Sequence, residues 1–256
     1  MIEQIEISDQ ELFNRIAEKY SKKDYFPASR IARKFIIKSI IKEINKYQPN
    51  IKNILEIGCG IGATTAYLDN SDINYHGLDY SSELIKLAQE SHSNKHTFYN
   101  LNLKEFERPV ESRYDLIMGV GLLHHVVDID SVMQKIGSFG NKETYYCFVE
   151  PFAGNPIIEL MRQIRKRIDP DYSSDQQTFT RKSFVDLFAR NGFNILRDKN
   201  KGYFSTPFSQ IILKPNLLSY PLSWISIKVD SLLQKIFPNC FLSWNIYLVA
   251  QYVEEK

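Results

Sequence analysis

The feature that most constrains the fold is a short apolar segment that runs directly into three closely spaced glycines. Residues 53–57 read NILEI, and Gly58, Gly60 and Gly62 follow on alternate positions before a helix-like stretch. Glycine adopts positive φ at no steric cost and has no Cβ, so a ligand can lie directly against such a main chain. The pattern therefore predicts a strand, a tight turn and a helix that together bind a nucleotide-like ligand.

Two classes of binding site share this spacing of glycines. The residues fit G-x-G-x-G, and with Ala63 in the last place they also fit the dinucleotide fingerprint G-x-G-x-x-A. Glu56 precedes Gly58 by two residues, so its carboxylate should point to the carboxyl end of the strand, where ligands bind. A carboxylate there would repel a pyrophosphate and suit a cation. Residues 56–62 resemble motif I of the class I S-adenosylmethionine-dependent methyltransferases, whose cofactor carries an ammonium and a sulfonium.

The next two predicted strands are followed by polar residues. Residues 73–79 end in Asp79, and a carboxylate at this place can accept hydrogen bonds from both hydroxyls of a ribose. Asn102 follows the third strand, at a position where the resembled family usually has aspartate. Its amide oxygen can still accept a hydrogen bond from an adenine amino group. The resemblance implies that Tyr80, Asn102 and Leu103 also contact the cofactor.

A fourth apolar segment leads into a pair of histidines. Residues 114–126, from YDLI to LLHHV, resemble the motif IV segment of the ubiquinone and menaquinone biosynthesis type of methyltransferase. The resemblance implies that the backbone at Gly119 and Val120 meets the methionine end of the cofactor. It also implies that His124 and His125 face the transferred methyl group. The next predicted strand ends in Glu150, in the layer where substrates bind. His124 and Glu150 are the candidate general bases, which are needed only for a protonated acceptor such as a hydroxyl.

The order of the predicted elements is that of an α/β protein. The resemblance implies a Rossmann-like, doubly wound, seven-stranded sheet that is mostly parallel, with an antiparallel last strand and a helical insertion before it. Residues 1–50 should form an N-terminal helical lid, which in the resembled family folds over the cofactor. Residues 51–256 should form the S-adenosylmethionine-binding domain, with insertions at about 151–178 and 207–241.

Local signals define the helices of the N-terminal segment. Ser8 and Glu11 form a capping box that predicts the start of a short helix. The polar residues 21–27 should end it, and a longer amphipathic helix should then run until just before Pro49. Both helices precede the first strand.

The first insertion contains a basic helix. Residues 157–168 include several arginines and a lysine, with Leu160 and Ile164 opposite part of that charge at helical spacing. The basic side chains either form a solvated face of the helix or bind an anionic group such as a phosphate.

The second insertion, 207–241, is rich in Leu, Ile, Trp and Pro and is much too long for a hairpin loop. A segment of this length should contain its own helices. These extend the core, cap the active site, or touch a membrane or a lipid-like substrate through residues such as Trp224, Ile225 and Leu232.

Composition narrows the classes of partner and the compartment. The formal net charge is +2, which gives no support for a nucleic-acid partner. Three cysteines supply no disulfide framework, and the acidic first residues lack the features of a signal peptide, so we expect a cytoplasmic protein. No apolar run is long enough to predict a membrane-spanning helix.

These observations together predict an S-adenosylmethionine-dependent methyltransferase without a metal site. We expect it to methylate a small molecule, at an oxygen atom of a lipid-linked or sugar-type acceptor that is amphiphilic or anionic. Two alternatives remain open. One is a nicotinamide-dependent oxidoreductase, which should tolerate Glu56→Gln, and the other is a non-catalytic protein that binds S-adenosylmethionine. The sequence does not indicate the oligomeric state.

Overall fold

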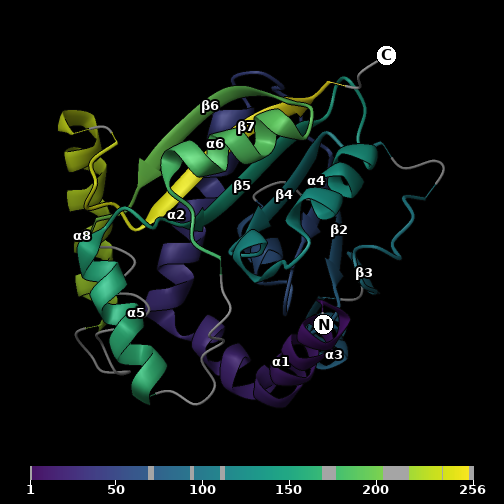
Figure 1. Cartoon of the computed structure of the whole chain (residues 1–256), viewed down its shortest axis with the longest axis horizontal. Coiled ribbons are helices and arrows are strands. Elements are labelled where there is room, and N and C mark those ends of the chain that lie inside the picture. Colours follow the sequence, from purple (N-terminus) through teal and green to yellow (C-terminus); the bar gives the residue numbers. More distant parts are fainter. Residues whose placement is uncertain are drawn as a thin grey trace.

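One seven-stranded sheet forms the centre of the molecule, with its strands in the order β3-β2-β1-β4-β5-β7-β6 (Figure 1). The structure is a computed structural model that describes residues 2–68, 72–92, 95–109, 113–168, 177–203, 219–237 and 239–253. The strands are β1 (Asn53–Ile57), β2 (Asn74–Asp79), β3 (Thr97–Asn100), β4 (Leu116–Val120), β5 (Tyr145–Pro151), β6 (Phe193–Lys201) and β7 (Asn245–Tyr252).

The directions of the strands confirm the predicted doubly wound sheet. Strands β1 to β5 pair in parallel, and Glu56 of β1 lies opposite Gly77 of β2 on one side and Met118 of β4 on the other. Strand β7 runs antiparallel between β5 and β6, and it is the one reversed strand of the described sheet. The strand order changes direction between β1 and β4, and strand ends at such a switch point form a crevice for ligands.

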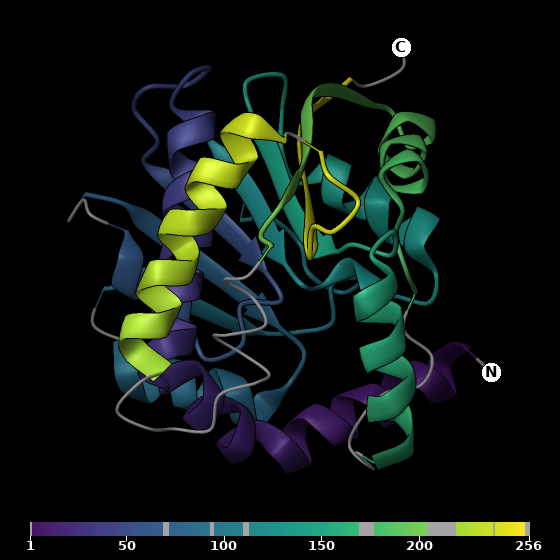
Figure 2. The ribbon, with the colours of Figure 1, turned by 90° about the vertical axis from the view of Figure 1, so that its left-hand side faces the viewer.

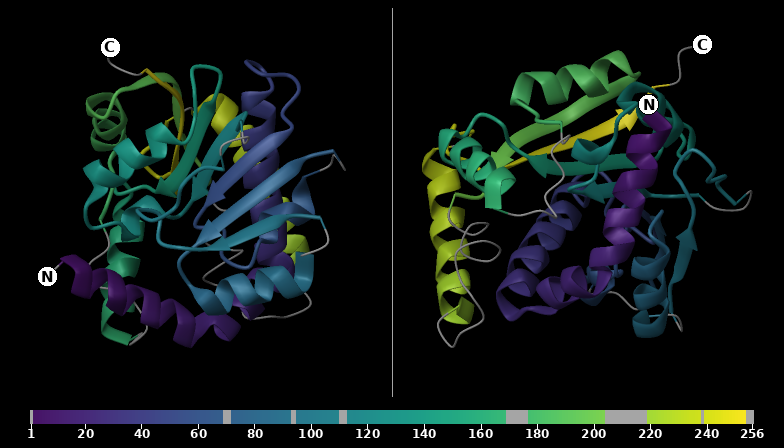
Figure 3. Two further views of the ribbon diagram at one scale, coloured as in Figure 1. Left: turned by 90° about the vertical axis from the view of Figure 1, so that its right-hand side faces the viewer. Right: turned by 60° about the horizontal axis from the view of Figure 1, so that its bottom comes forward.

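Helices cover both faces of this sheet. Helices α2 and α3 lie on one face, α4 and α6 lie on the other, and α8 packs outside α2 (Figure 2). Helix α1 lies along the edge where the parallel strands end (Figure 3). The helices are α1 (Ile2–Tyr25), α2 (Pro27–Ile44), α3 (Ser82–His92), α4 (Ile129–Ser138), α5 (Pro156–Ile168), α6 (Arg181–Arg190) and α8 (Ser219–Ile236), with 3₁₀ helices η1 (Ala63–Tyr67) and η2 (Leu123–His125).

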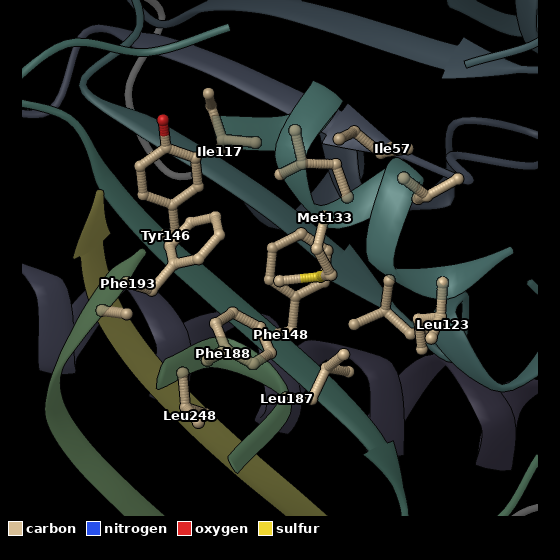
Figure 4. Close-up of a cluster of buried hydrophobic side chains, with 14 of the residues drawn as sticks. Ile57, Ile117, Leu123, Met133, Tyr146, Phe148, Leu187, Phe188, Phe193 and Leu248 are labelled. Atoms are coloured by element: carbon tan, nitrogen blue, oxygen red, sulfur yellow. The ribbon is translucent and has the colours of Figure 1, made fainter. Parts of the chain in front are cut away.

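Hydrophobic layers on each face hold the helices on the sheet. Phe148 of β5 lies among Met133 of α4 and Phe188 of α6, whose ring centroid is 5.7 Å from that of Phe148 (Figure 4). The neighbouring Cys147 and Val149 point to the opposite face, where they join the layer formed with α2. Burial on both faces explains why β5 reads as an almost continuous apolar run.

The structure corrects two boundaries that were predicted for the N-terminal helices. Helix α1 begins at Ile2, so Ser8 lies inside it and the capping box does not mark its start. The polar residues 21–25 stay helical, and the interruption before α2 is confined to Phe26. This residue has extended backbone because Pro27 disfavours a helical conformation at the position before it.

The segment after the glycines is also shorter than predicted. It forms the five-residue 3₁₀ helix η1 in place of the expected α-helix. The Thr65 hydroxyl donates a hydrogen bond to the Gly62 carbonyl at 2.8 Å, a local bond that competes with a regular helix. A helix dipole therefore contributes little to ligand binding at this turn.

The two insertions are described in part. Helix α5 occupies the first, as predicted, and α8 is the helix expected in the second. Residues 169–176, 204–218 and Pro238 lie outside the described residues. Among the helices that the structure describes, none is long and apolar enough to cross a bilayer.

We expect Phe188→Ala to lower the free energy of unfolding by about 3–5 kcal/mol, because it leaves a cavity beside Phe148 in a fully buried layer. Urea titration followed by circular dichroism measures this change. Phe241→Ala removes the same side chain where it is 61% exposed, and should change the free energy by less than about 0.5 kcal/mol. Equal losses in the two variants would contradict this packing.

Candidate functional site

The glycine turn leaves one of its glycines facing open space. Gly58, Gly60 and Gly62 have φ of +70°, +54° and +69°, in the left-handed region that favours glycine. A Cβ on Gly58 would contact Leu122 at 2.9 Å, and one on Gly62 would contact Phe98 at 2.7 Å. A Cβ on Gly60 would meet no atom within 4 Å, so the main chain at Gly60 is the part that a ligand can approach.

Asp79 joins this turn to the end of β2. Its Oδ2 accepts a hydrogen bond from the Gly60 N–H at 2.9 Å, and its Oδ1 accepts one from the Ser81 N–H at 2.9 Å. The residue is 7% exposed, and this burial raises the pKa of the carboxyl while the N–H donors oppose the shift. Two of the predicted cofactor residues, Gly60 and Asp79, are therefore in direct contact.

Glu56 is enclosed by protein groups. Its Oε1 accepts a hydrogen bond from the Thr64 hydroxyl at 2.9 Å, and its Oε2 accepts one from the Tyr75 hydroxyl at 2.5 Å. The residue is fully buried, and burial raises the pKa of its carboxyl against the opposing influence of Arg33. One carboxylate oxygen of Glu56 thus has a partner in η1 and the other has a partner in β2. These hydrogen bonds stabilise the turn from its buried side.

Arg33 connects the N-terminal helices to this buried acid. Its guanidinium pairs with Asp24 of α1 at 3.3 Å, and the two side chains are 19% and 11% exposed. Burial alone would lower the pKa of Arg33, but Asp24, Tyr20 and Glu56 outweigh burial and the net shift is upward. Nothing in the sequence signals this cluster, because its members belong to separate helices whose contact is set by the fold.

Helix α1 bridges two elements that carry predicted site residues. Gln10 donates a side-chain hydrogen bond to the Tyr80 carbonyl at 2.7 Å, and the Tyr80 hydroxyl donates one to Asp9 at 3.0 Å. The same Asp9 carboxylate lies 3.4 Å from Nδ1 of His125. Phe13 packs edge-on against Tyr80 and His125, with ring centroids 6.2 and 5.3 Å away. The helix thus spans the gap between the end of β2 and η2.

Three other predicted cofactor residues have local structural partners. Asn102 accepts the Lys104 N–H on its side-chain oxygen at 3.0 Å, which makes an Asx turn after β3. Leu103 is partly buried against the core. Gly119 leaves space for Phe148, because a Cβ there would lie 2.8 Å from that ring. Packing and turn geometry account for these residues, and their contact with a cofactor stays a prediction.

His124 and Glu150 form a hydrogen-bonded pair where β4 and β5 end. Nδ1 of His124 lies 2.7 Å from Oε2 of the fully buried Glu150. Oε1 of this carboxylate accepts the N–H groups of Leu122 and Leu123 at 2.9 and 2.7 Å, which fixes its position. Nε2 of His124 has no hydrogen-bond partner among the described residues. The acid therefore orients the imidazole, and Nε2 is the nitrogen that can accept a proton.

The surroundings of His124 lower the pKa of its imidazole. The side chain is 12% exposed, and this burial is the main cause. His125, whose ring centroid lies 4.1 Å away, and Arg162 add to the lowering. The hydrogen bond and charge of Glu150 act in the opposite direction without outweighing burial. His124 is therefore neutral near pH 7 and able to act as a base.

Helix α5 covers one of its arginines and exposes several apolar side chains. Arg162 is only 16% exposed and pairs with Glu159, on the side that influences His124. Ile157, Leu160 and Ile164 are instead 53%, 58% and 48% exposed. Ile158 is 5% exposed, so the covered side of the helix carries apolar and basic side chains together. Binding of an anionic group by its basic side chains stays a prediction.

A small recess, with a free volume of about 20 Å³ and partly open to solvent, lies on the α2 face of the same sheet edge. Lys201 is the one charged residue in its lining, with its ammonium 4.5 Å from the ring centroid of Tyr247. Burial lowers the pKa of Lys201 to about 8, and no described carboxylate forms an ion pair with it. The lining residues are Ala32, Phe35, Ile36, Ser39, Ile40, Val149, Lys201, Gly202, Asn245 and Tyr247.

Metal ligands do not gather in the described part of the chain. None of its groups of three or more His, Cys, Asp or Glu side chains is placed to hold an ion. The open main chain at Gly60 and the carboxylate beside it fit an organic cofactor with hydroxyl groups.

Comparison with known proteins identifies the family. A family model described as a methyltransferase domain matches residues 29–198, which is more than half of the chain. No curated protein matches the sequence significantly. A similar solved structure is the plantazolicin methyltransferase BamL in complex with a triazolic desmethylPZN analog and SAH. It is 14% identical, with a TM-score of 0.66, and the match covers 99% of this chain and 97% of that chain.

Two other similar structures come from named organisms. Magnesium protoporphyrin IX methyltransferase (ChlM) from Synechocystis PCC 6803 with bound SAH is 12% identical, with a TM-score of 0.63 and coverage of 95% and 98%. A SAM-dependent methyltransferase from Thermotoga maritima, described as a possible histamine N-methyltransferase, is 14% identical, with a TM-score of 0.64 and coverage of 95% and 99%. At these identities the likeness establishes the fold, and the ubiquinone and menaquinone type stays a prediction.

The family match, the order of the strands and the glycine turn all lead to one assignment. The match includes β1, the glycine turn and the His124–Glu150 pair. The chain therefore belongs to the methyltransferase domain family, and it is a class I S-adenosylmethionine-dependent methyltransferase.

Proposed function

We propose that this methyltransferase acts on a hydroxyl oxygen of a small, amphiphilic acceptor that carries an anionic group, of the lipid-linked or sugar-phosphate type. The cofactor, when bound, supplies a methyl group on a sulfonium, which is already an excellent leaving group. The protein must then align the acceptor, exclude water and remove the hydroxyl proton. The oriented His124–Glu150 pair is the observation that carries the proposal, because only a protonated acceptor needs such a base.

The glycine turn and Asp79 would hold the cofactor. The main chain at Gly60 faces open space, and the Asp79 carboxylate lies directly beside it. Each carboxylate oxygen has a second lone pair, so Asp79 can accept ribose hydroxyls without giving up its bonds to the backbone. Glu56 would contribute its charge and brace the turn, since both of its oxygens already have protein partners. Gly58 and Gly62 complete the left-handed path of the turn.

The N-terminal segment 1–50 would act as the lid over this site. The contacts of α1 support this role for the N-terminal segment. This helix contacts Tyr80, which follows β2, and His125 of η2. Helix α2 instead belongs to the core, where Ile37 and Ile40 are fully buried. In this arrangement α1 is the covering element and α2 is its anchor.

Proton removal is assigned to His124. Its Nδ1 is held by Glu150, and its lowered pKa keeps Nε2 unprotonated near neutral pH. Glu150 is fully buried and touches no open space, so it positions the imidazole and stabilises the charge that forms there.

The recess at Lys201 supports an anionic group on the acceptor, because Lys201 is the one charged residue in its lining. It is lined by Val149 of β5, whose side chain points to the opposite face of the sheet from that of the adjacent Glu150. Its walls are mostly aliphatic and aromatic, and Lys201 has no carboxylate partner among the described residues. A carboxylate or phosphate of the acceptor would supply the missing countercharge.

Family membership removes one of the alternatives raised by the sequence. The match to the methyltransferase domain overturns the nicotinamide-dependent oxidoreductase. A protein that binds the cofactor without turnover differs from the proposal in one measurable respect. It would give no methylated product with any member of a panel in which each hydroxyl compound is matched by its thiol and amine counterparts.

S-adenosylmethionine should raise the thermal unfolding midpoint of the native protein, and NAD should not. A ligand at a hundredfold excess over its Kd stabilises by about 2.7 kcal/mol. Gly60→Ala should abolish the shift, because its Cβ would occupy the open space of the turn. Gly192→Ala is the matched control, since Gly192 also has positive φ, at +81°, but lies at the end of α6. Retention of the shift in Gly60→Ala would contradict this site.

His124→Asn should reduce kcat for a hydroxyl acceptor by about 10²–10⁴-fold and should affect a thiol acceptor of the same shape far less. Titration by NMR should place the pKa of His124 below the usual value near 6.5. Glu150→Gln should lower that pKa further, because it removes the charge that raises it, and the acid limb of the rate profile should move to lower pH. An equal loss of kcat for the hydroxyl and the thiol acceptor in His124→Asn would contradict the role of His124 as a general base.

An acceptor with a free carboxylate or phosphate should have a lower KM than its neutral ester. Lys201→Met should raise the KM of the anionic acceptor by about 10–100-fold with little change in kcat, because a charged hydrogen bond contributes about 1.5–3 kcal/mol. Lys201→Arg should retain the preference. In the native protein this KM should rise as the pH passes about 8, where Lys201 loses its proton. An equal rise in the KM of the neutral ester in Lys201→Met would contradict the binding of the anionic group by Lys201.

A further inference from the structure

Helix α8 has the reverse of the usual amphipathic arrangement. Ser223, Ser226 and Asp230 are 0%, 5% and 0% exposed, on the side that packs toward α2. Trp224 and Leu232, on the outer side, are 54% and 59% exposed. A surface helix normally turns its apolar stripe to the core and its polar residues to water. The outer side of α8 is therefore built for an apolar environment.

Exposed apolar side chains are concentrated at this side of the molecule. Of 17 exposed large hydrophobic residues in the described chain, 13 lie in α5 or between Tyr220 and Leu242. Both helices face the viewer in Figure 2, with α8 outermost. A monomeric protein rarely exposes such a concentration unless it marks an interaction site. We call the outer surface of α8, with its exposed residues from Tyr220 to Leu242, the α8 face.

The charges on the α8 face are all of one sign. Lys228 and Lys235 are exposed, whereas Asp230, the only acid between Ser219 and Leu242, is fully buried. The ammonium of Lys228 lies 4.9 Å from the ring centroid of Trp224. Tryptophan and lysine are the side chains that suit the boundary between lipid headgroups and acyl chains.

We propose that the α8 face docks on the surface of a membrane that contains anionic lipids, with α8 lying in the plane of the headgroups. A second copy of the chain is a poorer occupant, because a twofold contact would bring the lysines of two faces together without an exposed acid on α8 to pair with them. Anionic headgroups supply that missing charge, and acyl chains cover Ile225 and Leu232. This docking is independent of the acceptor proposed above.

Vesicle binding tests the proposal directly. The full-length protein should co-sediment with vesicles of phosphatidylcholine and phosphatidylglycerol, bind phosphatidylcholine alone more weakly, and lose affinity as salt is raised. The chain has two tryptophans, and Trp244 is only 8% exposed, so Trp224 should report the contact. Its emission should shift to the blue on binding, and Trp224→Phe should remove that shift.

A double variant and a matched control locate the contact. Ile225→Ser with Leu232→Ser should reduce vesicle affinity by about tenfold or more, because both side chains leave water on docking. Ile7→Ser with Val253→Ser changes two residues that are 48% and 55% exposed elsewhere, and should leave binding unchanged. Absence of binding to anionic vesicles, or equal effects of the two double variants, would overturn the proposal. A third outcome would also overturn the proposal: no vesicle binding, together with a dimer that the Ile225→Ser and Leu232→Ser changes convert to a monomer. The α8 face would then be the contact between two copies of the chain.

Discussion

The hydrogen bond from the Gly60 N–H to Asp79 is the contact on which the rest of the site depends. Left-handed glycines expose the main chain after β1, and a carboxylate at the end of β2 takes up an N–H group that would otherwise lack a partner. The bond joins different strands, so it forms only in one register of their parallel pairing. The order of the sheet and the shape of the turn are thus a single constraint, and both must be correct before a cofactor can lie against the backbone.

Buried acids recur along this edge of the sheet and share one design. Glu56, Asp79 and Glu150 each accept hydrogen bonds from a loop or helix that follows a neighbouring strand or their own. An unpaired carboxylate in a protein interior would be strongly unfavourable, so these donors are what allows the acids to stay buried. In return each acid fixes a loop that would otherwise be free to move. The interactions that stabilise the edge therefore also fix the orientation of its side chains, most directly that of His124.

The sequence was sufficient to predict the sheet and the edge at which the site lies. Continuous apolar strands, glycines after β1 and polar residues at strand ends are local signals, and the structure puts Gly60, Asp79 and His124 where strands β1, β2 and β4 end. Their roles in binding and catalysis stay predictions. The inward turn of Arg162 and the outward turn of Leu160 could not be predicted, because the choice of buried side is made by contacts with distant elements. The same holds for Lys201, whose recess is lined by residues from four separate parts of the chain.

The place of β7 in the sheet has a consequence for how the protein is made. This strand is the last one that the structure describes, yet it lies between β5 and β6 and is hydrogen-bonded to both. During synthesis β6 and α6 emerge before the only strand that connects them to the remainder of the sheet. The edge of β5 that pairs with β7 therefore has no strand partner until residues 245–252 have been synthesised.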